Sequence, residues 1–215
     1  MDLANADLLL TTTRAVRKRL DLTRPVPREV VLDCIRVAVQ APTASNAQGW
    51  RWMVVTDAAK RAALAELYSR AGRDYLEAGA TGKISSDPQT LRVYRSAFHL
   101  VDTLADVPVH VIPCIEGRIG AEGNLSGVSF YGSVIQAAWS FMLALRARGL
   151  GSVWTTLHLR HEQEAAELLG IPYEDVSQVA LLPVAYTVGT DFRPAARGPV
   201  EDITFWDDWG ATAEL

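Results

Sequence analysis

The stretch Ala41-Pro42-Thr43-Ala44-Ser45-Asn46-Ala47-Gln48-Gly49-Trp50 leads from an apolar helical pattern into an apolar strand-like run. Proline and glycine near its two ends predict a loop. Its polar side chains are short hydrogen-bonding groups, namely Thr43, Ser45, Asn46 and Gln48. Such a loop either meets the polar edge of a ligand at the border of a sheet or uses Asn and Ser for local backbone bonds. Residue chemistry alone leaves both interpretations open.

Periodic patterns extend from this loop in both directions. Helical spacing of apolar residues predicts helices over residues 2–20, 27–41, 58–78, 89–104, 132–148 and 162–169. Strand-like runs cover residues 50–56, 107–115, 152–159 and 179–188. Because helices do not separate all the strands evenly, these patterns favour the α+β class over a regular doubly wound sheet.

Three segments of the chain carry more specific expectations. Pro108 and Pro113 favour an edge position or irregular ends for the strand over 107–115, since proline cannot donate to a central ladder. The helix over 132–148 is strongly apolar and is expected to be buried nearly all round. The glycine-rich residues 116–128 are expected to form a mobile loop. If this loop has a function, we expect it to act as a lid over a binding site.

The composition is that of a globular protein. The chain has 215 residues, of which 49% are hydrophobic and 21% are charged, and its formal net charge is −4. The negative net charge excludes an overall positive electrostatic field that would attract nucleic acid or an anionic membrane. The apolar run at residues 8–10 is too short to span a bilayer. Cys34 and Cys114 lack zinc-site spacing, so we expect no metal site and two buried thiols in a reducing, cytoplasmic compartment.

A basic cluster and a threonine pair are further candidate binding groups. On a helix, Arg14, Arg17 and Lys18 would share one face, which suits a phosphate or an anionic ring, or else a solvated helix end. Thr155 and Thr156, in a strand-like run, either present backbone N–H groups and hydroxyls to a ligand or belong to a core strand that threonine favours. The sequence shows no nucleotide-binding glycine motif, no Ser–His–Asp arrangement and no spaced carboxylate pair.

Several motifs, in order along nearly the whole chain, resemble those of the nitroreductase family of FMN-dependent oxidoreductases. Thr13-Arg14-Ala15-Val16-Arg17 resembles the family's N-terminal arginine motif, and residues 41–50 resemble its A-P-S-x-x-N-x-Q-P-W signature. Gly149-Leu150-Gly151, after the long helix, is similar to the family's G-L-G stop. Pro183–Tyr186 and Arg197–Val200 resemble its late strand and its closing motif.

The resemblance implies an α+β, nitroreductase-like fold with a central, mixed, mostly antiparallel sheet flanked by helices. It also implies one domain over residues 1–215 and a homodimer with FMN sites at the subunit interface. The tail, residues 189–215, would wrap the partner subunit. Its apolar side chains need a surface to cover, since the tail is too apolar for plain disorder.

The same resemblance assigns cofactor-binding residues by position. Arg14 and Arg197 would hold the FMN phosphate by charge-assisted hydrogen bonds. Arg17 would lie near N1 and the C2 carbonyl of the flavin, where a cation stabilises negative charge. The loop would bind the ribityl chain and the polar ring edge, and the backbone at 156 and 157 would face N5 and O4. The full expected set is Arg14, Ala15, Arg17, Pro42, Thr43, Ala44, Asn46, Gln48, Thr156, Leu157 and Arg197.

The implied activity is NAD(P)H-dependent reduction of nitroaromatics, quinones or similar electron-poor small molecules, with ping-pong kinetics. One alternative is a flavin enzyme of other chemistry, such as dehalogenation, azoline oxidation, flavin fragmentation or ene reduction. Another is a non-enzymatic protein that binds or stores FMN. Four positions depart from the family pattern. Thr13 replaces a frequent Arg and Ala15 a frequent Ser, which leaves the phosphate fewer ligands. Gly49 replaces a frequent Pro, and Leu157 replaces a frequent Gly.

Overall fold

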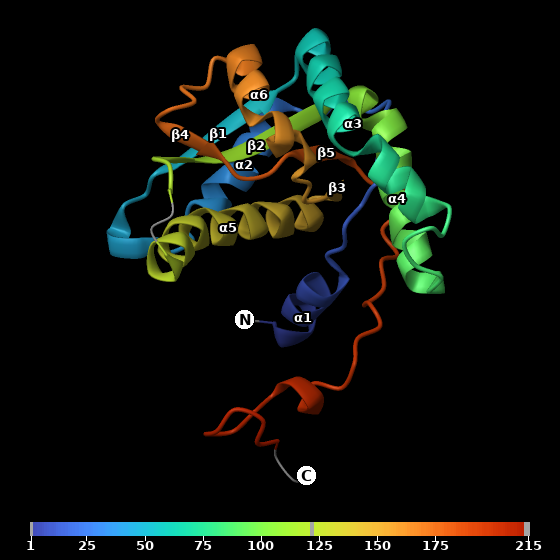
Figure 1. The fold of residues 1–215 in the computed structure, drawn as a ribbon, viewed down its shortest axis with the longest axis vertical. Coiled ribbons are helices and arrows are strands. Elements are labelled where there is room, and N and C mark those ends of the chain that lie inside the picture. The colour runs from blue at the N-terminus through green and yellow to red at the C-terminus, as the bar shows by residue number, and fades with distance from the viewer. Residues whose placement is uncertain (1, 121–122, 213–215) are drawn as a thin grey trace. The chain divides into compact units, whose positions relative to one another are not determined.

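The computed structural model describes residues 2–120 and 123–212, and the chain divides into two compact units (Figure 1). The larger unit, Thr13–Thr190, contains the sheet. The smaller unit joins Met1–Thr12 to Asp191–Leu215 and contains helix α1 (Leu3–Thr12) and the 3-10 turn Glu201–Ile203. The single domain and the tail exchanged between subunits stay predictions.

An antiparallel sheet forms the centre of the larger unit. Its strands are β1 (Trp50–Val55), β2 (Val109–Glu116), β3 (Leu150–Ser152), β4 (Val176–Gln178) and β5 (Leu182–Tyr186). Their order is β1-β2-β5-β3, and β4 also pairs with β2. The pairings between these strands are antiparallel, while two isolated bridges are parallel. The predicted α+β class and mostly antiparallel sheet are confirmed.

Helices cover both faces of this sheet. They are α2 (Arg28–Ala38), α3 (Ala58–Ala80), α4 (Pro88–Thr103), α5 (Asn124–Ala147) and α6 (Glu162–Leu169). Figure 1 shows α5 on one side of the sheet and α3 with α6 on the other. Val111 belongs to the core under α2 and α5, and its neighbour Ile112 belongs to the core under α3, α4 and α6. Alternation along β2 therefore fills both layers.

The helix predicted over residues 2–20 is wrong for its second half. Residues 13–20 run in extended and turn conformations beside β3, where the Val16 N–H donates to Ser152 O at 2.9 Å. The sheet edge supplies these backbone partners, and the burial of Val16 and Leu20 overrides the helical spacing. The basic side chains of this segment therefore do not share a helix face.

Strand β2 is central, although Pro113 predicts an edge strand. β1 pairs with it on one side, and on the other side its partner changes from β5 at residues 109–111 to β4 at residues 114–116. Pro113 lies at this change, so the ladder needs no N–H from it on that side. Its carbonyl still accepts the Val179 N–H at 3.0 Å.

Helix α5 begins earlier than predicted and is less buried. It starts at Asn124, so its first turns replace part of the loop expected over 116–128. Gly123 precedes the first residue of the helix and has a φ of 85°, a conformation that glycine adopts without a steric penalty. The all-round burial expected over 132–148 is also wrong, because Ile135 and Trp139 are 44% and 42% exposed.

The opposite face of α5 explains its apolar composition. By length and hydropathy alone this helix could cross a membrane. However, Val134, Ala138 and Phe141 are fully buried against the sheet, as in the core helix of a globular fold.

Two strands are shorter than predicted. The run over 152–159 contributes only its first residue, Ser152, to β3, after which the chain leaves the sheet and forms the 3-10 turn Leu157–His161. The run over 179–188 contains β5 but none of β4, which ends at Gln178. Both runs are rich in residues that favour strands, so composition carries no signal of where pairing stops.

Residues 13–20, here called the basic segment, pack against Gly151 of β3, and Thr187 packs there too. A Cβ at residue 151 would lie 2.9 Å from Val16 Cβ and 2.7 Å from Thr187 Cγ2. We expect Gly151→Ala to lower the free energy of unfolding by about 1–3 kcal/mol, because stiff β-branched side chains must move in a packed site. Urea unfolding measures this loss. Gly132→Ala, whose Cβ meets nothing within 4 Å, is the control, and equal effects would contradict the packing argument.

Candidate functional site

The loop between α2 and β1 holds three non-glycine residues in the left-handed backbone region. Ser45, Asn46 and Gln48 have φ of 51°, 53° and 51°. Such conformations cost on the order of 1–3 kcal/mol each and concentrate at ligand sites. The Gln48 N–H donates to Thr43 Oγ1 at 3.2 Å, and Gln48 Nε2 donates to Asn46 Oδ1 at 2.9 Å. The strained backbone supports the ligand-binding interpretation, whereas these bonds within the loop are those of the alternative, so the binding role stays a prediction.

Helix α5 fixes the loop through Ser133, which is nearly buried. Ser133 Oγ accepts the Ala44 N–H at 3.1 Å and donates to Ser129 O at 2.7 Å. Its carbonyl accepts the Trp50 Nε1–H at 2.8 Å. One residue thus supports the loop and the start of β1. A serine within an apolar helix carries no sequence signal of these partners, so the sequence does not identify it.

The basic segment places a partly buried cation beside α3. Arg17 Nε is buried and has no hydrogen-bond partner among the described residues. Burial lowers the pKa of Arg17, and nearby Tyr68 on α3 partly opposes that shift. Burial likewise raises the pKa of Tyr68. A desolvated guanidinium with an unused N–H is suited to bind an anionic or electron-rich group.

The turn after β3 carries two unpaired backbone donors. Within the described part of the chain, the N–H groups of Thr156 and Leu157 have no hydrogen-bond acceptor. The Leu157 side chain packs against α3 so closely that a Cβ at Gly72 would lie 2.3 Å from Leu157 Cδ1. Leucine at this position therefore faces the core, and its N–H stays available to a ligand.

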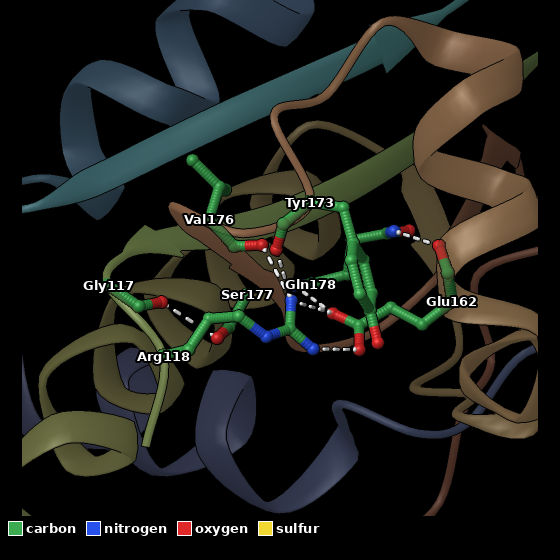
Figure 2. Close-up of polar contacts among 7 residues, drawn as sticks. All are labelled: Gly117, Arg118, Glu162, Tyr173, Val176, Ser177 and Gln178. Carbon is green, nitrogen blue, oxygen red and sulfur yellow. Dashed lines mark hydrogen bonds and ion pairs between the residues drawn. The ribbon is translucent and has the colours of Figure 1, made fainter. Parts of the chain in front are cut away.

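A partly buried ion pair follows this turn (Figure 2). Arg118 Nη2 donates to Glu162 Oε2 at 2.7 Å. Arg118 Nη1 donates to Tyr173 O at 2.7 Å and to Val176 O at 3.1 Å. Glu162 Oε1 accepts the Gln178 N–H at 3.0 Å, and hydrogen bonding to Glu162 raises the pKa of Arg118. The network joins the loop after β2, the first residue of α6, and β4.

Two hollows adjoin these groups and share Arg118 and Ile119 in their walls. The first, of about 350 Å³, is bordered by the strained loop at Thr43 and Ala44. The second, of about 290 Å³, includes Thr156, and its larger apolar side chains are Tyr131, Ile135, Trp154 and Leu159. A third hollow, of about 320 Å³ beside α2 and β1, includes none of the predicted site residues.

The structure gathers the predicted cofactor residues into two groups. Pro42, Thr43, Ala44, Asn46 and Gln48 form the loop held by α5. Arg14, Ala15 and Arg17 lie with Thr156 and Leu157 near β3. Tyr68 and Gly72, which are one turn apart on α3, show that Arg17 and Leu157 border the same stretch of that helix. Arg197 belongs to the smaller unit, and its place in the site stays a prediction.

Two histidines are fully buried near this region. His110 Nε2 lies 2.8 Å from Leu104 O, whereas neither ring nitrogen of His158 has a partner in the described chain. Burial lowers the pKa of each ring to about 4. For His158, adjacent Gln178 opposes this shift and His110 adds to it. Both rings are therefore neutral at pH 7 and act as parts of the core.

Residues 10–186 match the family model described as the nitroreductase family. The chain belongs to the nitroreductase family. This assignment bears out the resemblance of its motifs. Among curated proteins, an NADH dehydrogenase from Thermus thermophilus is 29% identical, and the alignment covers 92% of this chain and 97% of that protein.

Two solved structures share the nitroreductase fold with this chain. One is an FMN-dependent nitroreductase from Mycobacterium smegmatis in complex with NADPH, with a TM-score of 0.69, 21% identity, and coverage of 96% of this chain and 100% of that chain. The other is an iodotyrosine deiodinase bound to FMN and 3-iodo-L-tyrosine, with a TM-score of 0.67, 23% identity, and coverage of 89% and 93%. These likenesses confirm the predicted fold.

Acid is expected to weaken this nitroreductase-family protein through its two buried histidines. Their folded-state pKa values lie below the ordinary 6.5, so the unfolded chain binds protons first as the pH falls. Their contribution to stability is complete above about pH 6.5 and is lost towards pH 4, by about 3 kcal/mol for each ring. Urea unfolding across this window measures the slope.

The variant His158→Leu isolates one ring from the carboxylates that titrate in the same range. Since leucine binds no proton, the stability of this variant should depend less steeply on pH than that of the wild type. An unchanged slope would contradict the assignment.

Proposed function

We propose that this protein binds FMN beside the basic segment and the turn after β3, and uses NAD(P)H to reduce neutral, electron-poor small molecules such as nitroaromatics and quinones. Membership of the nitroreductase family confirms the predicted enzyme class. The relative from Mycobacterium smegmatis is FMN-dependent and binds NADPH, which supports both molecules for this chain. Two observations carry the proposal: the buried, unpaired Nε of Arg17, and the unpaired N–H groups of Thr156 and Leu157 in a turn that borders the same stretch of α3.

These residues fit a flavin and its phosphate. Bound FMN supplies hydride acceptance and donation at N5. Arg17 would place positive charge where negative charge develops on the ring, and the Thr156 and Leu157 N–H groups would donate to its polar edge. Arg14 and Arg197 would hold the phosphate. No side chain is assigned as a catalytic acid or base.

The walls of the two hollows support a neutral acceptor. Their charged side chains are already paired: Glu116 with Arg51, and Arg118 with Glu162. An acceptor bearing a carboxylate would have to compete with Glu162 for Arg118, whereas a flat neutral molecule meets aromatic and aliphatic groups. Nucleotide and acceptor would use this space in turn, as ping-pong kinetics requires.

A homodimer would complete the site. The predicted cofactor residues form two groups in one chain, and a second copy can bring its own loop at Pro42–Gln48 to the Arg17 group. The exposed face of α5 is apolar and suits a second copy, with Leu125, Val128, Ile135 and Trp139 all at least 42% exposed. The tail wrapped around the partner and the cytoplasmic location are parts of this proposal.

A dehalogenase is the second candidate, because one structural relative is a deiodinase bound to 3-iodo-L-tyrosine. Its substrate is a zwitterionic amino acid, so this candidate requires Arg118 to leave Glu162 or a cation from the partner. A protein that only stores FMN is the third, and it predicts bound flavin that NAD(P)H cannot reduce.

Anaerobic spectroscopy tests the proposed activity. The purified protein should absorb as a flavoprotein, lose that absorbance with NADPH or NADH, and regain it with a nitroaromatic or a quinone but not with 3-iodotyrosine. Reoxidation by 3-iodotyrosine alone would favour the dehalogenase. A protein that contains no flavin and binds none would refute the proposal.

A variant of the basic segment tests the assigned residues. Arg17→Met should weaken FMN binding at least about tenfold, because a charge-assisted hydrogen bond contributes roughly 1.5–3 kcal/mol. Fluorescence titration of FMN into the flavin-depleted chain measures this loss. Lys18→Met, at the exposed neighbouring position, is the matched control. Equal affinities in the two variants would show that Arg17 does not contact the cofactor.

A further inference from the structure

The turn that carries the Thr156 and Leu157 N–H groups is not capped by the Thr156 side chain. Its backbone bonds include one from Leu159 N to Thr156 O at 3.0 Å and one from Glu162 N to Leu159 O. Leu157 anchors one end against Gly72 of α3. Arg160 Nη1 also donates to Ala71 O of α3 at 3.0 Å, so α3 holds one side of the turn. A separate attachment, at Glu162, joins the end of the turn to the sheet.

We propose that Glu162 is a positioning residue that fixes this turn, and with it the backbone donors for the flavin ring. The inference rests on the proposed FMN site. Glu162 would not touch the cofactor; it would act through the backbone of residues 157–161, which connects it to Thr156.

Glu162 is bonded through each of its three acceptor oxygens. Oε2 accepts from Arg118, and Oε1 accepts the Gln178 N–H. Its backbone O accepts from Gln178 Nε2 at 2.9 Å. Because Gln178 pairs with Cys114 of the central strand, Glu162 ties the end of the turn directly to the sheet (Figure 2).

Arg118 is itself immobilised, so it gives Glu162 a fixed partner. Its guanidinium donates to the carbonyls of Tyr173 and Val176 and stacks 4.0 Å from the centre of the Tyr173 ring. The side chains of Arg118 and Glu162 are only 28% and 16% exposed, so water replaces their contact poorly. Loss of the Glu162 charge would leave a partly buried cation and free the turn.

Glu164 offers a matched control on the same helix. It pairs with Arg70 of α3 at 2.9 Å and with His161 at 2.7 Å, and its side chain is 48% exposed. These contacts include His161, the last residue of the turn, but neither β4 nor the loop after β2, so the comparison isolates the attachment to the sheet. Glu162→Gln and Glu164→Gln therefore make the same chemical change in a central and a peripheral ion pair of α6.

The experiment compares these two variants in the full-length chain. FMN is titrated into flavin-depleted protein, and hydrogen–deuterium exchange follows the Thr156 and Leu157 amides without FMN. We expect Glu162→Gln to bind FMN about tenfold more weakly, or about 1.4 kcal/mol, and to exchange these amides faster. Glu164→Gln should match the wild type within about twofold in affinity.

Equal FMN affinity and equal exchange in the two variants would overturn the inference and leave the proposed function intact. Equal losses in both would also overturn it, since they would show a general loss of stability. If Glu162→Gln does not fold, Arg118→Lys replaces it: lysine keeps the charge but loses the planar fork, and a normal FMN affinity there would overturn the inference. A wild-type chain that binds no FMN would refute the proposed function alone, and amide exchange would still test the role of Glu162.

Discussion

The pairing of β2 on both edges, with both faces covered, is the constraint on which the larger unit depends. β1 lies along one edge, and the other edge is shared by β5 and β4. The side chains of Val111 and Ile112 enter opposite cores. On one edge of β2 the pairing partner changes at Pro113, from β5 to β4. This edge can therefore pair with two separate strands. Through β4, the same edge holds the network around Glu162.

Elements with clear local boundaries were predictable from the sequence. Asp57 and Asp87 cap α3 and α4 by accepting the backbone N–H groups of Lys60 and Thr90. The basic segment was not predictable in this way, since its helical spacing continues from α1 while its backbone partners come from β3. Tertiary hydrogen bonds decided its conformation, and one sequence contains no record of them.

The candidate site shows the same division. The loop at 42–48, Arg17, Thr156 and Leu157 could be named because motifs of the family mark their positions. Ser133 and Glu162 could not, because their partners lie far away in sequence: 89 positions separate Ser133 from Ala44, and 44 separate Glu162 from Arg118. Their importance comes from burial and geometry, which appear only when the chain is folded.

Helix α5 has a consequence for the energetics of assembly. Ser133, which holds the strained loop, stands two positions from Ile135 on the exposed apolar face. Covering that face with a second copy would restrain the helix turn that carries the loop anchor. Association and ligand binding would then be thermodynamically linked, so each would strengthen the other. By mass action, the apparent affinity for a ligand at the loop would rise with protein concentration, and dilution would release ligand and partner together.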